Sequence, residues 1–202
     1  IRRQRQMCIR DSTLQVRVAE RVPMAQVWAW QRDGDGVTPY DCVRLQLDET
    51  GHEMSPNDGY SVVAPEKQAE WSLPVVSGIE LKKLKSLSPG RPAGLPKLQA
   101  ALGLIGEFRR SALAGVVDLR VIDLSQPRIL RVTTGNGGQV DLSTDRLARQ
   151  LDRWARIRAH GQKFGLAIEM VDLSVTNNVP VRWMLSPTIA EDIKNGRNLA
   201  GK

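Results

Sequence analysis

The stretch that decides the fold class is Ile129–Leu142, which reads ILRVTTGNGGQVDL. Apolar and polar residues alternate on both sides of a Gly-Asn-Gly-Gly segment, a pattern typical of two short strands joined by a tight turn. The sequence therefore predicts an antiparallel hairpin formed by Ile129–Thr134 and Gln139–Leu142. No Lys-Ser or Lys-Thr pair follows the glycines, so this turn is not a phosphate-binding loop.

A helix is predicted on the N-terminal side of this hairpin. Pro96 suits a first helical turn, and Leu98, Leu102 and Ile105 form one apolar stripe at helical spacing. Gly115 is a natural C-terminal stop for this helix.

A second helix is predicted on the C-terminal side of the hairpin, from Thr144 onward, with Ser143 as its cap. Leu147, Leu151 and Trp154 recur at helical spacing, so we expect these side chains to point inward.

Strands are predicted outside this central part of the chain. In the strand just before the hairpin, Val117, Leu119 and Val121 share one face. Lys82–Pro96 is basic and rich in Pro and Gly, which indicates a surface connection, and Asp48–Gly51 is a turn. The other predicted strands are Thr13–Val22, Val27–Gln31, Cys42–Leu47, Leu73–Val76, Ile168–Val175 and Val179–Met184. The order of strands, helix, hairpin, helix and hairpin predicts an α+β fold with a mostly antiparallel sheet and two helices.

Composition restricts the class of protein further. The 202 residues are 41% hydrophobic and 25% charged, a globular balance that excludes wholesale disorder. The chain has no apolar run of about 18 residues, so we expect no transmembrane helix within it. Two cysteines exclude a disulfide framework and a four-cysteine zinc site.

Residues 1–12 match the translation of a widely used transposase sequencing adapter from Arg2 to Ser12. We therefore interpret this segment as a library artefact and exclude it from the argument. It holds four Arg and one Asp, so the formal net charge of +7 falls to +4 for the rest of the chain. This lower charge weakens the case for a nucleic-acid partner.

Candidate catalytic and metal-binding residues are few. His52 and His160 have no second ligand at metal spacing and are expected to be exposed to solvent. Asp33 and Asp35 lack the rest of a calcium loop, and Cys42 lies in an alternating strand without the setting of a nucleophile. We expect no catalytic site, no metal and no cofactor.

Five short motifs, taken in order, resemble the bacterial cell-division family FtsQ/DivIB. The resemblance covers roughly Leu14 to Met184. Its motifs are Glu20–Ala25, Leu47–Gly51, Leu73–Gly78, Val121–Ser125, and Val171–Leu173 followed by Val179–Trp183.

This resemblance implies a domain organisation. Residues 13–23 would be the last strand of a POTRA domain, residues 24–185 an FtsQ-type β domain, and residues 186–202 a polar C-terminal tail. A cytoplasmic tail, a membrane helix and most of the POTRA domain would precede the chain. The protein would then be a single-pass protein of the inner membrane, with this part on the periplasmic side.

The resemblance also implies a non-enzymatic scaffold that recruits FtsB- and FtsL-type membrane proteins during septum formation. Recruitment would occur by β-augmentation, in which a partner segment adds a strand to an exposed sheet edge. The residues that match the family's partner-binding positions are Ser174, Val175, Thr176, Asn177, Asn178, Val179 and Val181. Pro180 independently favours an edge strand, because central strands exclude proline.

Several alternatives stay open at this point. Val181 and Trp183 could pack in the core instead of facing a partner, and the pair at 177–178 could simply form a turn. Arg149 and Arg153 could form an electrostatic flank that attracts acidic partner residues, or only a solvated helix face. The chain could also be another POTRA-containing envelope assembly protein or a basic nucleic-acid-binding domain, although we expect no nucleic acid.

Overall fold

The computed structural model describes residues 4–10, 13–19, 21–31, 41–54, 73–85 and 92–185. Asp33, Asp35 and the tail 186–202 lie outside the described residues. The strands are β1 (Gln4–Arg10), β2 (Thr13–Ala19), β3 (Ala25–Gln31), β4 (Asp41–Leu47), β5 (Glu53–Met54), β6 (Val75–Glu80), β7 (Leu119–Asp123), β8 (Ile129–Thr134), β9 (Gln139–Ser143), β10 (Leu166–Asp172) and β11 (Val181–Leu185). The helices are α2 (Leu81–Lys85), α3 (Pro96–Arg110) and α4 (Leu147–Gln162).

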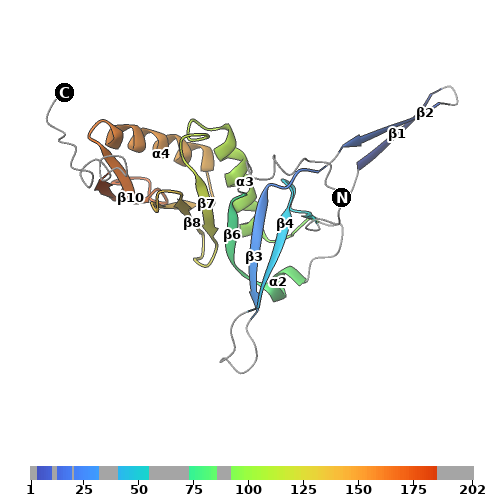
Figure 1. The fold of residues 1–202 in the computed structure, drawn as a ribbon, viewed down its shortest axis with the longest axis horizontal. Helices are drawn as coiled ribbons and strands as arrows, with labels where there is room; N and C mark the ends of the chain where they lie inside the picture. Colours follow the sequence, from blue (N-terminus) through green and yellow to red (C-terminus); the bar gives the residue numbers. More distant parts are fainter. Residues whose placement is uncertain are drawn as a thin grey trace, which may run out of the picture.

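Within the described part of the chain, nine strands form one mixed sheet in the order β11-β10-β9-β8-β7-β6-β3-β4-β5. Most neighbouring strands are antiparallel, and the parallel pairs are β3–β6, β6–β7 and β9–β10. A parallel pair needs a long crossover connection, which α3 supplies between β6 and β7 and α4 between β9 and β10 (Figure 1). The predicted α+β class with a mostly antiparallel sheet is confirmed.

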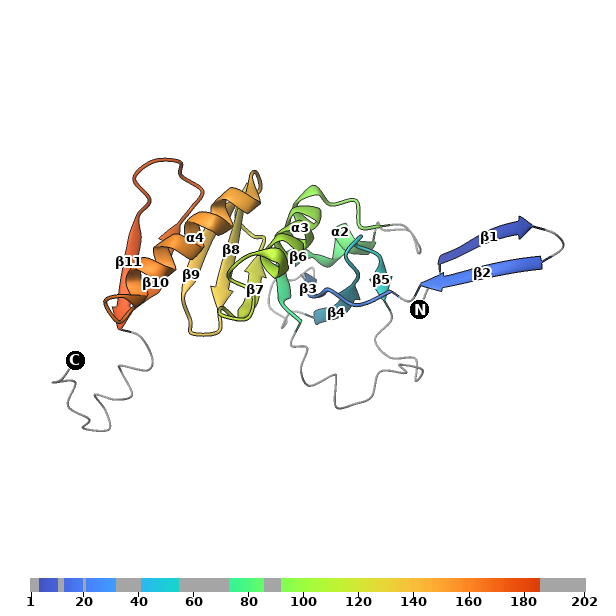
Figure 2. The ribbon, with the colours of Figure 1, turned by 90° about the horizontal axis from the view of Figure 1, so that it is seen from above.

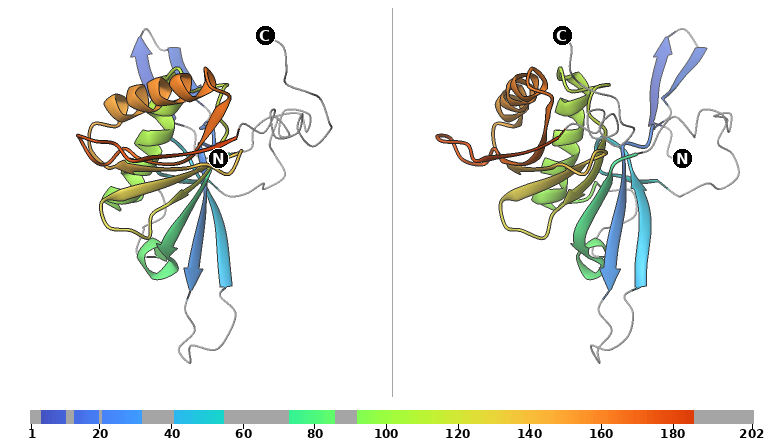
Figure 3. Two further views of the ribbon diagram at one scale, coloured as in Figure 1. Left: turned by 90° about the vertical axis from the view of Figure 1, so that its left-hand side faces the viewer. Right: turned by 60° about the vertical axis from the view of Figure 1, so that its left-hand side comes forward.

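A row of buried side chains crosses the sheet and holds the two main helices on one face. Each member of this row pairs with the next member on the neighbouring strand. All six side chains are at most 1% exposed: Val27, Val76, Ile122, Val132, Val140 and Val171. Figures 2 and 3 show α3 and α4 along this side of the sheet, where Phe108 and Trp154 bring their ring centroids within 6.0 Å. This shared apolar layer is the core of the domain.

The boundaries of the helices differ from the sequence-based prediction. Helix α3 begins at Pro96 as expected but ends at Arg110, where the Ser111 hydroxyl donates to the Phe108 carbonyl at 2.8 Å. Gly115, with φ of 76°, lies in the turns beyond it. The predicted surface connection Lys82–Pro96 begins inside the short helix α2.

The predicted cap of the second helix is wrong. Helix α4 begins at Leu147 after Arg146, whose φ is 53°, and its N-terminus has no side-chain cap. The buried Gln150 instead folds back onto Ser143, accepting from the Ser143 N–H at 2.9 Å and donating to its hydroxyl at 2.8 Å. The Gln150 side chain therefore binds the backbone and hydroxyl of Ser143, and no serine hydroxyl caps the first N–H groups of the helix.

Strand β7 also departs from strict alternation. A register shift between Leu119 and Val121 marks a bulge against β8. A bulge changes which face the following residues occupy, so Leu119 and Ile122 are buried while Val121 is only half-buried. The prediction that Val121 shares the inner face with Leu119 is therefore wrong.

Strands β1 and β2 pair with each other as an antiparallel hairpin, separate from the nine-stranded sheet (Figure 1). Strand β1 lies in the segment interpreted as adapter-derived, and that interpretation stays a prediction, which sequencing the 5′ end of the gene would check. The assignment of residues 13–23 to the end of a POTRA domain also stays a prediction.

A matched pair of glycines tests how tightly α4 packs on the last strand. A Cβ at Gly161 would overlap the ring of Trp183, whereas a Cβ at Gly103 in α3 would meet nothing within 4 Å. Gly103→Ala is expected to stabilise the fold by about 0.5–1 kcal/mol, because alanine is the better helix former. Gly161→Ala is expected to destabilise it by about 1–2 kcal/mol, because overpacking outweighs the same gain. Urea denaturation of both variants measures this difference, and equal gains would contradict the packing of Trp183 on α4.

Candidate functional site

The candidate site is the sheet edge formed by β11. This strand is terminal in the sheet, and no strand within the described residues pairs with its outer side. The edge position agrees with the expectation from Pro180, which directly precedes the strand. An exposed edge presents backbone N–H and C=O groups that a further strand can bind.

The orientation of the β11 backbone follows from one hydrogen bond. The Asp172 N–H donates to the Pro180 carbonyl at 3.2 Å, so position 180 faces β10. Residues of an antiparallel strand alternate in the direction of their backbone groups. Val181 and Trp183 therefore direct their N–H and C=O groups to the open edge, and Arg182 directs its groups to β10.

The side chains of this strand divide between the two faces of the sheet. Val181 extends the buried row, since it pairs with Val171, and both it and Trp183 pack against the core. Arg182 lies on the other face, where its guanidinium contacts Glu169 at 3.3 Å. The two interpretations left open for Val181 and Trp183 are thus compatible: the side chains belong to the core, while the backbone faces the edge.

The predicted extent of the last two strands is wrong. Strand β10 ends at Asp172 and β11 begins at Val181, so Ser174, Val175, Thr176, Asn177, Asn178 and Val179 lie in the connecting loop. The Asp172 carboxylate ends β10 because it accepts from both the Ser174 N–H, at 2.9 Å, and the Ser174 hydroxyl, at 2.6 Å. Asn178 has a φ of 50°, which an extended strand does not allow.

This loop, residues 173–180, presents polar and small apolar groups to solvent. The exposed members are Val175, Thr176, Asn177, Asn178 and Pro180. Ser174 is half-buried, and Val179 packs against the core. The structure thus brings all seven predicted partner-binding residues to one corner of the sheet, six in the loop and Val181 at the start of the edge strand.

The two arginines predicted as an electrostatic flank differ in their contacts. Arg153 donates from Nη1 to the Val175 carbonyl at 2.8 Å and from Nη2 to the Thr176 carbonyl. Arg149, one turn earlier in α4, is exposed, and its side chain makes no hydrogen bond or ion pair to any described residue. Arg153 therefore stabilises the conformation of the loop through backbone contacts, a role that the sequence did not indicate.

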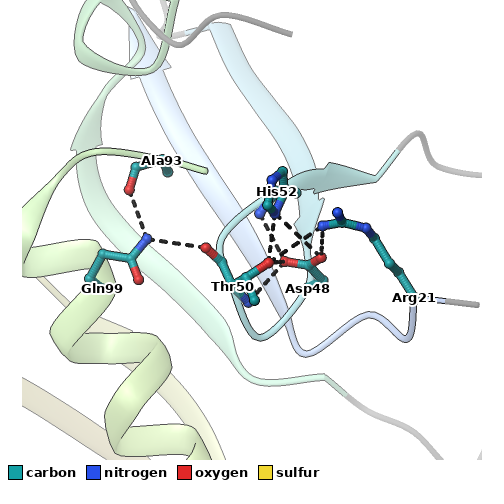
Figure 4. Close-up of polar contacts among 6 residues, drawn as sticks. All are labelled: Arg21, Asp48, Thr50, His52, Ala93 and Gln99. Carbon is teal, nitrogen blue, oxygen red and sulfur yellow. Dashed lines mark hydrogen bonds and ion pairs between the residues drawn. The ribbon is translucent and has the colours of Figure 1, made fainter. Parts of the chain in front are cut away.

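A second polar cluster lies at the opposite end of the sheet, in the turn after β4 (Figure 4). The Asp48 carboxylate accepts from the Thr50 N–H at 2.9 Å, the Thr50 hydroxyl at 2.7 Å and the His52 N–H at 2.9 Å, and it forms an ion pair with Arg21. Burial alone would raise the pKa of Asp48, but these hydrogen bonds outweigh it, so the pKa lies below its ordinary value. His52 is half-buried, with Nδ1 2.6 Å from the Thr50 hydroxyl, so the expectation of a solvent-exposed side chain is wrong for this histidine.

The contacts of this cluster connect separate segments of the chain. It connects Arg21, which precedes β3, to the turn between β4 and β5, and the Gln99 amide of α3 joins the Thr50 carbonyl at 3.4 Å to the Ala93 carbonyl at 2.8 Å. Among the described residues, no group of three His, Cys, Asp or Glu side chains could hold a metal ion.

A cavity of about 350 Å³ lies between the C-terminal half of α4 and the start of β10. Its lining includes apolar Val140 and Ile168, an Asp118–Arg120 ion pair at 2.7 Å, and Arg158, which donates to the Val116 carbonyl at 3.2 Å. Its arginine and aspartate groups are thus engaged with neighbouring groups of the protein. The sheet edge is the stronger candidate site.

Comparison with known proteins identifies the family. Residues 40–174 match the family model described as "Cell division protein FtsQ/DivIB, C-terminal". The chain belongs to the FtsQ/DivIB family. No curated protein matches the chain.

FtsQ/DivIB proteins are non-enzymatic cell-division proteins, which agrees with the expectation drawn from the sequence motifs. They are membrane-anchored members of the divisome, and none of the helices in the described segments is long and apolar enough to cross a membrane. The family match ends at Ser174, so β11 lies beyond it. For the edge strand, the sheet topology is the independent observation.

Proposed function

We propose that this FtsQ/DivIB chain is a divisome scaffold that captures FtsB- and FtsL-type partners by adding a partner strand to β11. The observation that carries the proposal is the open edge of β11, whose outward backbone groups are unpaired within the described residues. Backbone hydrogen bonds supply affinity in this mode of recognition, and side chains beside the strand supply specificity.

The loop of residues 173–180 supports the proposal as the specificity element. It directly precedes the edge strand and exposes the side chains of Val175 and Asn177 to solvent. In the proposed setting, a membrane helix on the N-terminal side anchors the protein in the inner membrane, and this domain lies in the periplasm. Membership of a cell-division family favours this function over nucleic-acid binding or another envelope assembly role.

Amide hydrogen exchange, followed by NMR, tests strand addition directly. The probe is the extracytoplasmic segment of the FtsB-type protein encoded in the same genome. The Val181 and Trp183 amides, which face the open edge, are expected to become protected at least about tenfold when the segment is added. The Arg182 amide faces β10 and serves as the internal control, because it is protected before binding. Binding without new protection at Val181 and Trp183 would contradict strand addition at this edge.

A further inference from the structure

We propose that Arg153 is a positioning residue for partner capture, because it holds the loop before β11 in the conformation that receives the partner. This inference rests on the proposed function and assigns a task to one side chain of α4. Arg153 would act through the loop and not by direct charge attraction to the partner.

The contact geometry supports this role. The two Nη atoms of Arg153 bind consecutive backbone carbonyls, those of Val175 and Thr176. A guanidinium presents its donors in a rigid planar fork, so binding two adjacent carbonyls restricts the orientation of both peptide planes. Lysine has a flexible stem and a single nitrogen and cannot reproduce this restriction.

The platform that carries Arg153 is rigid. Its neighbours in α4, Leu151 and Trp154, are 1% and 2% exposed and belong to the core. The helix therefore fixes the origin of the arginine side chain relative to the sheet.

The loop has few other restraints. Its ends are held by the bond from the Leu173 N–H to the Asp141 carbonyl, at 2.8 Å, and by the Asp172–Pro180 bond. Between these ends, over residues 175–179, Arg153 makes the only hydrogen bonds that the structure shows to another described residue. Removal of its side chain would leave the exposed part of the loop without a polar restraint.

The consequence for binding is a change in the conformational entropy that the loop loses when the partner binds. A loop that is already ordered loses less conformational entropy when a partner docks, so preorganisation increases affinity without a new contact. Arg153→Ala is expected to weaken capture of the FtsB-type extracytoplasmic segment about tenfold. Arg153→Lys, which keeps the charge and loses the fork, is expected to give a loss of several-fold.

Arg149→Ala is the matched control. It removes the same charge from the same helix one turn away, without a contact to the loop, and is expected to change affinity by less than about twofold. Binding is measured by titration of the chain with the segment at several salt concentrations. Backbone ¹⁵N relaxation of residues 174–179 in the free chain gives a second readout, and only the Arg153 variants are expected to increase motion there.

Each outcome decides between distinct hypotheses. Equal losses and equal changes in salt dependence for Arg149→Ala and Arg153→Ala would show that Arg153 acts through its charge, which overturns positioning. Increased loop motion with unchanged affinity, or unchanged motion with either Arg153 variant, would also overturn it. The Val181→Pro variant tests the proposed function separately. If this variant loses capture while both Arg153 variants capture the partner normally, the positioning role alone is rejected. If Arg153→Ala reduces the thermal stability of the chain, the Lys variant decides the question.

Discussion

Replacing Val181 with proline is expected to reduce capture of an FtsB-type segment at least about a hundredfold while the domain stays folded. The Val181 N–H faces the open edge, so proline removes a donor that a partner strand needs and leaves the ladder between β10 and β11 intact. The partner strand would bury a carbonyl without a donor and would also contact the proline ring. A binding penalty of about 3 kcal/mol corresponds to the hundredfold loss of affinity.

Val181→Ala provides the matched control for the side chain. Valine at this position packs against the core, so both substitutions lose apolar contact and are expected to cost about 1–2 kcal/mol of stability. Alanine keeps the outward N–H, and capture should change by less than about fivefold. A titration with the extracytoplasmic segment, together with urea denaturation of both variants, separates the two effects. Capture by a folded Val181→Pro variant at wild-type affinity would reject strand addition at β11.

Replacing Asp48 with alanine is expected to destabilise the domain by about 2–4 kcal/mol. The Asp48 carboxylate is 5% exposed and accepts from two backbone N–H groups, one hydroxyl and Arg21. Its removal leaves the partly buried Thr50 and His52 N–H groups without their acceptor, and the loss of hydrogen bonds to a charged group is costly. The neighbouring Glu49 is exposed, so Glu49→Ala is expected to change stability by less than about 0.5 kcal/mol. Comparable urea midpoints for the two variants would show that the Asp48 cluster contributes little.

The same carboxylate predicts how stability depends on pH. Its pKa in the folded chain lies below the ordinary value for aspartate, because hydrogen bonds outweigh burial. A lowered folded-state pKa contributes stability that is fully present above the unfolded-state pKa and is lost as the pH falls through the folded-state pKa. The free energy of unfolding should therefore decrease as the pH is lowered below about 4.

Asp48→Asn isolates this contribution, because the amide does not titrate. The difference in unfolding free energy between the wild type and this variant is expected to be constant from about pH 6 to 8 and to shrink in acid. Denaturation at a series of pH values measures the difference. A difference that does not change with pH would show that the carboxylate charge is not what stabilises the turn.

How far the sequence predicted the fold depends on the range of the interactions involved. The alternation around the Gly-Asn-Gly-Gly turn and the apolar stripe after Pro96 are local patterns, and the structure confirms both elements. The predicted end of α3 at Gly115 is wrong, because the helix ends at the contacts of Ser111. The predicted serine cap of α4 is wrong, because the Gln150 side chain reaches back over seven residues and accepts from the Ser143 N–H.

The candidate site shows the same division. Pro180 indicates an edge strand from sequence alone, because proline lacks the donor that a central strand requires. Alternation extends the preceding strand to Val175, and this prediction is wrong because Asp172 ends β10 through contacts that alternation cannot show. The attachment of Arg153 to the Val175 carbonyl joins residues 22 apart in sequence, and no local pattern contains it.

The sequence by itself determined the α+β class, the central hairpin, the two main helices and the likeness to FtsQ/DivIB, because these depend on periodicity, turn chemistry and short motifs. Only the tertiary structure decided the order of the nine strands, and that Val181 faces the core with its side chain and the edge with its backbone. It also decided the pairing of Arg21 with Asp48. Strand order and long-range polar contacts arise when distant segments compete for one buried surface, and that competition is settled by packing of the whole chain.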